Sequence, residues 1–530
     1  MSHSGRVLIA DPVAPICRQI LETAGLEVEV RVGASPADLK ARMAGTLALV
    51  VRSETRVTED LLAAAPDLRV VGRAGTGVDN IDVEAATRRG VVVMNAPGEN
   101  TIAAAEHTLS LMLSLARNIP RADRSLKSGQ WERSRFLGVE LHQKKLGIVG
   151  LGKVGREVAA RARAFGMEIL GYDPFLPEDA VSRLGLQRVS LQGILEQADF
   201  LTVHVPLNGQ TRHLIGREEL QRCKPGLRVV NCARGGLIDE KALSDAIREG
   251  RVSGAALDVF EEEPPGPGHP LVGLETVVAT PHLGASTVEA QEKVAVRIAQ
   301  QIVAYLQRGS VTGAVNVDSI DPEVLKAIGP WLDLAERLGR LQARMAPPGA
   351  DEVIVELSGT ILDHPVQPIV AAFLKGFLTD RVTDPVNLVN APVLARESGL
   401  RVSEVRASDS VDYTSLVTAT LRAGPAYRAI SGTLFGKRDL RIVRLDEYHF
   451  DALPAGEMLI CSNDDRPGMV GSLGTLLGKA GINIANLSLG RDRTGGRAIA
   501  IFNLDSPVDG PLLARIRKLD GILWAERVSL

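Results

Sequence analysis

Residues 145–173, KLGIVGLGKVGREVAARARAFGMEILGYD, decide how the first half of the chain folds. The stretch predicts a strand, a tight turn, a helix and a second strand, and the turn carries the pattern G-x-G-x-x-G. Gly150 permits the turn, Gly152 lets a pyrophosphate approach the backbone, and Gly155 lets the helix pack closely against the strand. A glycine-rich turn alone is common, but its place between these elements is typical of a dinucleotide site.

The second strand of this unit ends at Asp173, which lies 23 residues after Gly150 (173 − 150). An acid about 20 residues after the first glycine binds the adenine ribose in dinucleotide sites. The carboxylate would accept hydrogen bonds from the ribose hydroxyls and repel a 2′-phosphate, so the sequence favours NAD over NADP. The alternative interpretation is a structural glycine turn without a ligand.

The composition of the 530-residue chain limits its class. At about 150 residues per domain the length predicts three or four domains, and 45% hydrophobic with 24% charged residues is typical of folded protein. The net charge of −3 gives no sign of nucleic-acid binding, no apolar run is long enough to span a bilayer, and the start does not resemble a signal peptide. Cys17, Cys223, Cys232 and Cys461 fit neither a zinc site nor a disulfide framework. We therefore expect a cytoplasmic protein with no metal, membrane or nucleic-acid partner.

Strands and helices alternate through residues 145–281, and a similar alternation fills residues 1–97. Aromatic residues make up only 3%, so Val, Leu, Ile and Ala must build the cores, which suits parallel sheets covered on both faces. After His282, VEAQEKVAVRIAQQIVAYL predicts one long amphipathic helix, which ends at the basic Arg308 and the stop signal Gly309.

The pattern changes near Gly313. Residues 313–453 predict strands and helices without a βα period, as in an α+β domain. Residues 457–530 predict the order β–α–β–β–α–β of a ferredoxin-like domain. The expected fold class is α/β, with two doubly wound, Rossmann-like domains followed by these two smaller ones.

Polar side chains recur at the predicted ends of successive strands: Asp173, His204, Arg234, Asp258 and His282. The gaps between them are 31, 30, 24 and 24 residues, each about one βα unit. Ligands of a doubly wound sheet lie outside the carboxyl ends of its strands. We therefore expect these five side chains to meet in one crevice.

Three side chains in this region suggest chemistry. Arg234 can hold a substrate carboxylate with two parallel hydrogen bonds and polarise a neighbouring carbonyl. His282 can take the proton of a hydroxyl group and return it, and Glu263 can pair with His282 and fix its orientation. Each residue alone also fits a surface ion pair, a strand cap or a solvated loop, so the hypothesis depends on their coincidence with the nucleotide pattern.

NCARGG, ALDVFEEEPP and ATPHLGAST resemble the signature stretches of the D-isomer-specific 2-hydroxyacid dehydrogenases. VVRSETRVT, VVGRAGTGVDNID, GLGKVGREVA and GYDP narrow the resemblance to the branch of that family that acts on 3-phosphoglycerate, and it runs from residue 5 to about residue 312. The rest of the chain resembles the long form of this branch. The resemblance implies four domains: a discontinuous substrate-binding domain (1–97 and 285–312), an NAD-binding domain (98–284), an intervening domain (313–453) and an ACT regulatory domain (457–530).

The resemblance also implies an activity, the NAD-dependent oxidation of 3-phosphoglycerate to 3-phosphohydroxypyruvate in L-serine biosynthesis, by a homo-oligomer that is expected to be a tetramer. Arg234, Glu263 and His282 would be catalytic. The NAD site would be formed by Thr76, Gly150, Gly152, Lys153, Val154, Gly155, Asp173, His204, Val205, Pro206, Cys232, Ala233, Arg234, Asp258, His282, Gly284 and Ala285. The substrate would be held by Arg52, Ser53, Arg73, Asn100, Arg133 and Arg135. The last two arginines would enter from a neighbouring subunit; a solvated basic turn is the alternative for them.

The turn NDDRPG and the stretch GINIANL resemble the ACT signature and imply an L-serine site at Asp465 and Asn483, across an interface between two ACT domains. In the alternative, both residues only cap a turn and a strand.

Two other functions stay open. A reductase of hydroxypyruvate, glyoxylate or 2-oxoglutarate would share the catalytic set but has less need for the arginines or the ACT domain. A non-enzymatic, NAD-sensing corepressor would use the same scaffold. Formation of NADH with 3-phosphoglycerate separates all three.

Overall fold

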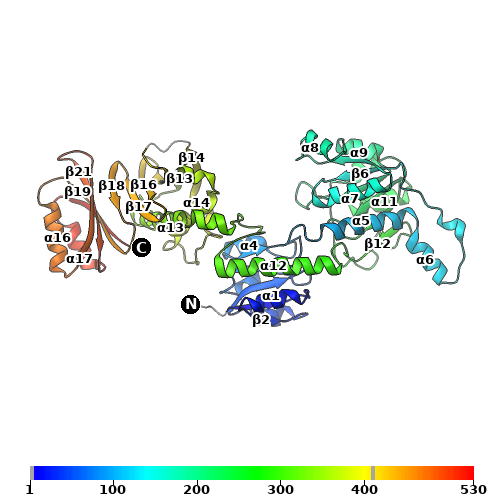
Figure 1. Ribbon diagram of the computed structural model, residues 1–530, viewed down its shortest axis with the longest axis horizontal. Helices are drawn as coiled ribbons and strands as arrows, with labels where there is room; N and C mark the ends of the chain where they lie inside the picture. Colours follow the sequence, from blue (N-terminus) through cyan, green and yellow to red (C-terminus); the bar gives the residue numbers. More distant parts are fainter. Residues whose placement is uncertain (1–4, 408–411) are drawn as a thin grey trace.

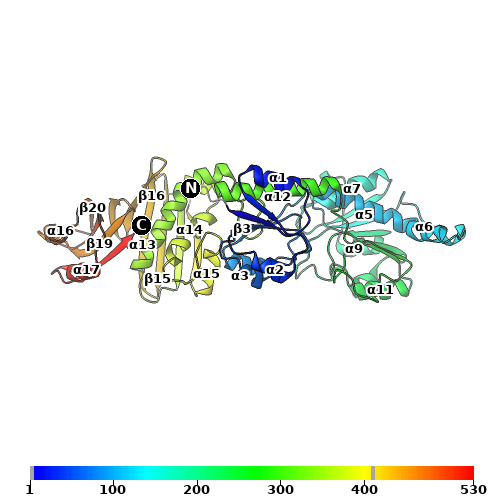
Figure 2. The same ribbon diagram turned by 90° about the horizontal axis from the view of Figure 1, so that it is seen from below.

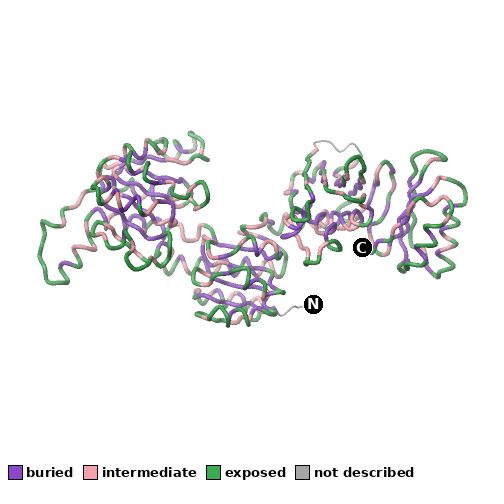
Figure 3. The backbone as a smooth tube through the Cα atoms, turned by 180° about the vertical axis from the view of Figure 1, so that it is seen from behind, coloured by how far each residue is buried: buried purple, intermediate pink, exposed green. Residues whose placement is uncertain are grey.

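The computed structural model describes residues 5–407 and 412–530, with the backbone alone for residues 179 and 180. Four β-sheets, numbered here by their order along the chain, lie in a row in an elongated molecule (Figures 1 and 2). The second sheet lies at one end and is followed by the first, the third and the fourth. Figure 3 shows that the buried segments lie inside each of these bodies.

The first sheet is parallel throughout, with the order β2-β1-β3-β4-β5. Its strands are β1 (Arg6–Ile9), β2 (Glu27–Val30), β3 (Thr46–Val51), β4 (Val70–Arg73) and β5 (Val92–Met94). One face is covered by α1 (Ile16–Thr23) and α12 (Val288–Arg308), the other by α2 (Pro36–Ala41), α3 (Glu59–Ala63) and α4 (Val83–Arg88) (Figure 2). The sheet is therefore doubly wound, and its last covering helix comes from a distant part of the chain.

The second sheet is also parallel, with the order β12-β11-β10-β9-β6-β7-β8. Its strands are β6 (Lys145–Val149), β7 (Glu168–Tyr172), β8 (Gln187–Arg188), β9 (Phe200–Val203), β10 (Leu227–Asn231), β11 (Val252–Leu257) and β12 (Val277–Ala279). One face is covered by α5 (Thr101–Ala116), α7 (Lys153–Ala164) and α8 (Glu178–Arg183), the other by α9 (Leu191–Gln197), α10 (Arg217–Arg222) and α11 (Glu240–Arg248). The strand order reverses between β6 and β9, which is where such sheets bind ligands.

The chain crosses between these two sheets twice. The first crossing precedes α5, and the second precedes α12, whose N-terminus is capped by the Thr287 side chain and whose C-terminus ends at Gly309 with a φ of 69°. Helix α6 (Ile119–Lys127) and the segment with the short 3-10 helix η1 (Arg133–Phe136) project from the second sheet at one end of the molecule (Figure 1). Both crossings run past the carboxyl ends of the strands.

The third sheet is mixed and has the order β14-β13-β15-β16-β17-β18. Its strands are β13 (Glu352–Gly359), β14 (Arg401–Ala407), β15 (Ser415–Ala423), β16 (Ala426–Phe435), β17 (Asp439–Leu445) and β18 (Tyr448–Ala452). The helices beside it are α13 (Pro322–Met345), α14 (Gln367–Leu378), α15 (Ala391–Glu397) and the 3-10 helix η2 (Thr360–Asp363).

The fourth sheet is antiparallel and has the order β20-β21-β19-β22. Its strands are β19 (Glu457–Asp464), β20 (Ile484–Arg491), β21 (Arg497–Leu504) and β22 (Ile522–Ser529), with α16 (Met469–Lys479) and α17 (Gly510–Arg517) on one face. The other face contributes Ile460 and Ile501 to the same buried cluster as Leu334 and Leu338 of α13. The third and fourth sheets therefore share one core.

The predicted fold class is confirmed, as are the long helix that ends at Gly309 and the β–α–β–β–α–β order at the C-terminus. Among the described residues, no helix combines the length and the apolar character that crossing a bilayer requires. The four cysteines are free thiols.

Candidate active site

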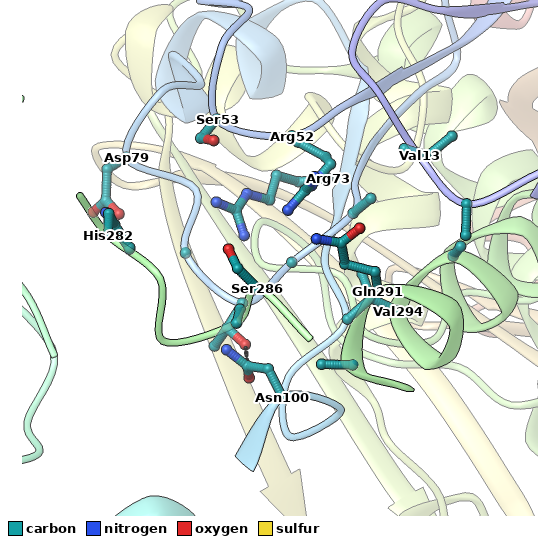
Figure 4. A pocket seen from close by; sticks show the side chains of 18 of the residues that line it. Val13, Arg52, Ser53, Arg73, Asp79, Asn100, His282, Ser286, Gln291 and Val294 are labelled. Atoms are coloured by element: carbon teal, nitrogen blue, oxygen red, sulfur yellow. Dashed lines mark hydrogen bonds between the residues drawn. The ribbon is translucent and has the colours of Figure 1, made fainter. Parts of the chain in front are cut away.

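A pocket of about 290 Å³ lies where the first and second sheets meet. The first sheet and its loops contribute Arg52, Arg73, Thr76 and Asp79. The second contributes the three residues predicted to be catalytic, and Asn100 and Ala285 come from the two crossings. Figure 4 shows that the Arg73 guanidinium, the Ser286 hydroxyl and the Gln291 amide point into the same space.

The His282 ring is held by a carboxylate. Its Nδ1 is 2.7 Å from Oε2 of Glu263, whose other oxygen accepts a hydrogen bond of 3.1 Å from the Phe260 N–H. Burial alone would raise the pKa of Glu263, but the hydrogen bond and charge of His282 lower it below its ordinary value. The ionised carboxylate therefore fixes Nδ1 as the protonated nitrogen and leaves Nε2 able to accept a proton.

Arg234 follows β10, in a turn in which the Asn231 side chain donates to the Arg234 carbonyl at 2.8 Å. Its Nε donates to Oδ2 of Asp79 at 3.0 Å, and its Nη1 donates to the Ala233 carbonyl at 2.7 Å. Since Asp79 belongs to the first sheet, this ion pair bridges the two sheets. It fixes the plane of the guanidinium and leaves Nη2 without a hydrogen-bond partner among the described residues.

Two further guanidinium groups in the pocket, those of Arg52 and Arg73, form no ion pair with another described residue. Among the described residues, the Arg52 side chain donates one hydrogen bond, of 3.3 Å, to the Pro12 carbonyl. The Arg73 Nε is buried and lacks a hydrogen-bond partner among the described residues. Burial, with the positive charges of Arg234 and Arg52, lowers the pKa of Arg73 to about 10. The pocket therefore holds an excess of positive charge that an anion would relieve.

The nucleotide turn has the shape that its glycines predict. Gly150 has a φ of 95°, and a Cβ there would lie 2.5 Å from the His204 carbonyl oxygen. A Cβ on Gly155 would lie 2.1 Å from the Gly150 carbonyl oxygen, whereas one on Gly152 would meet nothing within 4 Å. The backbone at Gly152, directly before α7, is therefore open to a ligand.

The first turn of α7 includes Lys153 and Val154, and its N-cap, Gly152, offers no side-chain cap. Free backbone N–H groups at a helix start favour a pyrophosphate. Asp173 follows β7, and its Oδ2 accepts the Leu151 N–H of the glycine turn at 3.0 Å. This places a carboxylate beside the turn, as a ribose site requires. The residues present thus fit NAD.

The remaining residues predicted for the NAD site lie at the ends of β9, β10 and β11. His204, Val205 and Pro206 follow β9, and Cys232 and Ala233 follow β10. Burial raises the pKa of the Cys232 thiol to about 12, so this sulfur stays protonated and is no nucleophile. Asp258 follows β11 and accepts the Gly284 N–H at 2.8 Å.

Thr76 and Asn100 join the two sides of the pocket. The Thr76 hydroxyl donates to Oδ1 of Asn100 at 2.8 Å, and the Asn95 side chain donates to the Thr76 carbonyl at 2.5 Å. Ser53 also lines the pocket. Four of the predicted substrate residues therefore line the same pocket: Arg52, Ser53, Arg73 and Asn100.

Two of the predicted substrate residues, Arg133 and Arg135, do not line this pocket. Both lie on η1, in the segment that projects from the second sheet (Figure 1). Arg135 pairs with Glu132 at 3.0 Å and with Glu275 at 3.4 Å. A role at the pocket therefore requires a second copy of the chain.

The two residues predicted to bind serine lie at opposite ends of β20. Asp465 accepts a hydrogen bond of 3.3 Å from Arg491, at the end of this strand, while Asn483 directly precedes the strand and donates to Asp505 at 2.7 Å. The eight residues of β20 span about 26 Å. One chain therefore does not bring these side chains together.

For some residues of the pocket the sequence predicted no role. Asp79 lies in GTGVDNID, a stretch that carries the family resemblance, but an isolated acid gave no reason to expect an ion pair with Arg234. Ser286 lies in ATPHLGAST, another stretch of the family resemblance, and Gln291 follows it, but no role was predicted for either residue.

The fold, the glycine turn and the Arg–Glu–His set together define an NAD-dependent dehydrogenase of D-2-hydroxyacids. Residues 109–284 match the model of the D-isomer specific 2-hydroxyacid dehydrogenase NAD binding domain. Residues 327–446 match the D-3-phosphoglycerate dehydrogenase intervening domain, and residues 458–521 match the ACT domain. A similar solved structure is the TT0316 protein of Thermus thermophilus, with 36% identity and a TM-score of 0.54 over 58% of this chain and 99% of that one.

Curated relatives extend over the whole chain. The D-3-phosphoglycerate dehydrogenase of Archaeoglobus fulgidus is 41% identical over 99% of this chain and 100% of the relative. That of Methanocaldococcus jannaschii is 42% identical over 98% of each. The chain belongs to the D-3-phosphoglycerate dehydrogenase family. The family resemblance, the enzyme class and the NAD cofactor that the sequence predicted are thereby confirmed.

The partly buried imidazole of His204 makes the stability of the protein depend on pH. Burial lowers the pKa of His204 from 6.5 to about 4, and its Nε2 lies 3.0 Å from the Thr202 hydroxyl, which can donate to the neutral ring. Between these two values the unfolded chain takes up a proton that the folded chain does not, so stability falls as the pH falls. The variant His204→Gln should lose less stability than the wild type between pH 7 and pH 4.5, by up to about 2 kcal/mol in urea unfolding. Equal losses would show that His204 titrates normally.

Proposed function

We propose that this protein oxidises 3-phospho-D-glycerate to 3-phosphohydroxypyruvate with NAD, the first step of phosphorylated L-serine biosynthesis. The observation that carries the proposal is the pair Arg52 and Arg73, two guanidinium groups that share the pocket with Arg234, Glu263 and His282 but lack an opposite charge there. Asp79 pairs with Arg234 and Glu263 with His282. A substrate with two anionic ends, one of them a phosphate, supplies the missing charge.

In the proposed orientation, the carboxylate of the substrate lies on Arg234 and the phosphate on Arg52 and Arg73, with Ser53 and Asn100 beside it. A planar guanidinium donates two parallel hydrogen bonds to a carboxylate or a phosphate, which a lysine cannot do. Holding both ends of a three-carbon acid fixes its middle carbon relative to His282. This positioning is the main contribution of the binding residues to the rate.

The side chains of the pocket transfer one proton during the reaction. His282 accepts the proton of the C2 hydroxyl at Nε2, because Nδ1 is committed to Glu263. NAD, when bound, accepts the hydride from C2. Arg234 stabilises the carbonyl oxygen that forms at C2, and Glu263 stabilises the charged imidazole. In the reverse direction His282 returns the proton.

The proposal includes the division of the chain and the NAD residues expected from the sequence. Residues 1–97 and 285–312 form the substrate-binding domain, 98–284 the NAD-binding domain, 313–453 the intervening domain and 457–530 the ACT domain. The packing of α1 with α12 on the first sheet supports the discontinuous domain. The open backbone at the glycine turn supports the NAD residues.

We further propose a cytoplasmic homo-oligomer, with a tetramer as the expected state. The projecting segment that holds η1 exposes Trp131 and Leu137, which are 76% and 90% exposed, and both support burial against a second copy. Such a contact would let Arg133 enter the pocket of the neighbour. It would leave Arg135 in its pairs with Glu132 and Glu275.

The proposal for Arg73 is tested with substrates that differ only in the phosphate. The variant Arg73→Met removes one charged partner of that group, so kcat/KM for 3-phosphohydroxypyruvate should fall about 10- to 100-fold. The reduction of hydroxypyruvate, which lacks the phosphate, should change by less than about threefold. Steady-state oxidation of NADH measures both rates.

The matched control is Arg89→Met, which changes an exposed arginine that follows α4 and should leave both rates unaltered. If Arg73→Met lowers kcat/KM equally for both substrates, Arg73 does not bind the phosphate. A wild type that reduces hydroxypyruvate or glyoxylate at least as well as 3-phosphohydroxypyruvate would establish the alternative reductase. A wild type without turnover of any of these acids would favour the corepressor.

The proton-transfer role belongs to His282. The variant His282→Ala should lower kcat by about 100- to 10,000-fold, because the general base is lost. NADH should still bind with an affinity within a few-fold of the wild type, as measured by quenching of protein fluorescence. A kcat near that of the wild type would remove His282 from the mechanism.

The ACT domain is proposed to make the enzyme sensitive to L-serine. Asp465 and Asn483 lie at opposite ends of β20, so antiparallel pairing of two such strands would bring Asp465 of one chain close to Asn483 of the other. L-serine should lower the rate of 3-phosphoglycerate oxidation, D-serine should not, and Asp465→Ala should remove the effect. An unchanged rate of the wild type at saturating L-serine would reject this site.

A further inference from the structure

A buried network ties the loop that carries His282 to helix α5. His107 lies on α5, and its Nε2 is 3.1 Å from Oδ1 of Asp258 and 3.2 Å from Oγ1 of Thr280. The Thr280 hydroxyl in turn donates to Oδ1 of Asp258 at 2.6 Å. An ionised carboxylate accepts hydrogen bonds, so the His107 tautomer that fits this network carries its proton on Nε2.

The Asp258 side chain is fully buried and holds the loop at several points. Its Oδ1 accepts the Leu283 N–H at 2.7 Å, and its Oδ2 accepts the Gly284 N–H at 2.8 Å. Its own backbone carbonyl accepts the His282 N–H at 2.8 Å. One residue therefore fixes the backbone on both sides of the His282 side chain.

The loop needs this support because His282 has a φ of 55°. A residue with a Cβ rarely adopts this left-handed conformation, and it persists only where the surroundings impose it. The conformation directs the His282 ring to Glu263 and to the pocket. Loosening the hydrogen bonds to Asp258 would let the backbone relax and turn the imidazole away.

His107 is the only side chain among the described partners of Asp258 that comes from outside the β11–loop region, since the other donors lie at residues 280–284. Burial would raise the pKa of Asp258, but the hydrogen bonds from His107, Thr280 and the Leu283 N–H lower it. A buried carboxylate that loses a donor is costly, and the loop would shift to compensate.

His107 lies on the helix that follows the first crossing between the two sheets. Helix α5 begins at Thr101, directly after the first crossing between the two sheets, and its N-cap is Asn100 of the pocket. The loop held by Asp258 leads into the second crossing, which ends at α12. The contact between His107 and Asp258 therefore joins the two crossings beside the pocket.

We propose that His107 is a positioning residue for the reaction: by donating Nε2–H to Asp258 it holds the loop at the second crossing in the conformation that aims His282 at the substrate. The inference rests on the proposed function. His107 does not line the pocket and acts through Asp258 and Thr280, which together hold the loop. Its loss should therefore change the rate of proton transfer rather than the binding of the substrate.

The test compares His107→Leu, which fills a similar volume without a donor, with His107→Gln, whose amide can still donate to Asp258. The kcat for 3-phosphoglycerate should fall about 10- to 100-fold in His107→Leu, because a small misplacement of a catalytic group is this costly. KM for 3-phosphoglycerate should stay within about threefold, since the pocket arginines are not moved. His107→Gln should recover most of the lost kcat.

The control for a purely structural effect is Leu109→Ala, a buried residue of the same helix that packs in the core of the second sheet. It should lower the melting temperature and leave kcat unaltered below that temperature. The inference is overturned by a kcat of His107→Leu within about twofold of the wild type, by failure of His107→Gln to recover activity, or by an equal loss in Leu109→Ala.

The same three variants assayed in hydroxypyruvate reduction separate this inference from the proposed function. That reaction depends on the same His282 loop but not on the phosphate. A wild type that fails with 3-phosphoglycerate but reduces hydroxypyruvate would contradict the proposed substrate. The kcat values of the variants in the reduction would then still decide the role of His107.

Discussion

The site depends on the way in which a single buried carboxylate holds a strained loop. Asp258 accepts N–H groups on the chain that follows His282 and also receives the His282 N–H at its own carbonyl. With a φ of 55°, His282 has a backbone conformation that is unfavourable in isolation. The conformation is maintained because several hydrogen bonds act on the same short stretch at once. The His282 ring can pair with Glu263 only when this backbone is fixed. Asp258 therefore determines the position of His282, and that position allows the hydrogen bond to Glu263.

The side chains of the pocket differ in whether a carboxylate of the chain pairs with them. Arg234 and His282 each have a carboxylate partner, which sets their orientation without a ligand. Arg52 and Arg73 have no such partner in the part of the chain that the structure describes, and burial, together with the positive charges of Arg234 and Arg52, lowers the pKa of Arg73. Arg234 and His282 are thus already oriented for the reaction, whereas Arg52 and Arg73 are left to bind an anion. Because the two groups reside on different sheets, an anionic substrate that contacts both would also hold the sheets together.

The sequence predicted those parts of the site that local patterns encode. Glycines at fixed spacing and polar residues at successive strand ends were enough to bring Asp173, Arg234 and His282 to one sheet edge, because parallel strands separated by similar lengths end together. The contact of His107 with Asp258 spans 151 positions in the chain and has no local signature. It depends on how α5 packs against β11, which is a property of the assembled core. The discontinuous arrangement of α12 likewise followed from the family resemblance rather than from any residue pattern.

Two edge strands carry too weak a local pattern to be predicted from the sequence. β2 reads Glu-Val-Glu-Val, is only partly buried and lies at the edge of the first sheet, so it lacks the continuous apolar run of a central parallel strand. β8 has two residues and also lies at an edge. In contrast, all four strands of the fourth sheet were predicted, because β19 and β21 are buried almost throughout and read as apolar runs, and distinct turns separate the elements.

The contacts beyond the pocket restrict how the C-terminal sheets can influence it. Because the third and fourth sheets share a core, a force on one must move both, and the stacking of Arg428 of β16 over Trp524 of β22 at 5.1 Å adds to that union. This joint body meets the first sheet at few points, among them the Arg88–Glu397 ion pair of 2.9 Å and the hydrogen bond of 2.8 Å from Asn387 to the Gly90 carbonyl.

These contacts fall at the last residue of α4 and in the turn that leads to β5, and β5 pairs with β4, the strand that ends at Arg73. A rotation of the joint body would thus act first on the strand beside the one that carries Arg73. The catalytic set, with Arg234, Glu263 and His282 all on the second sheet or the second crossing, lies beyond that point. Along these contacts the path from the fourth sheet therefore reaches the strand beside Arg73 before it reaches the catalytic set.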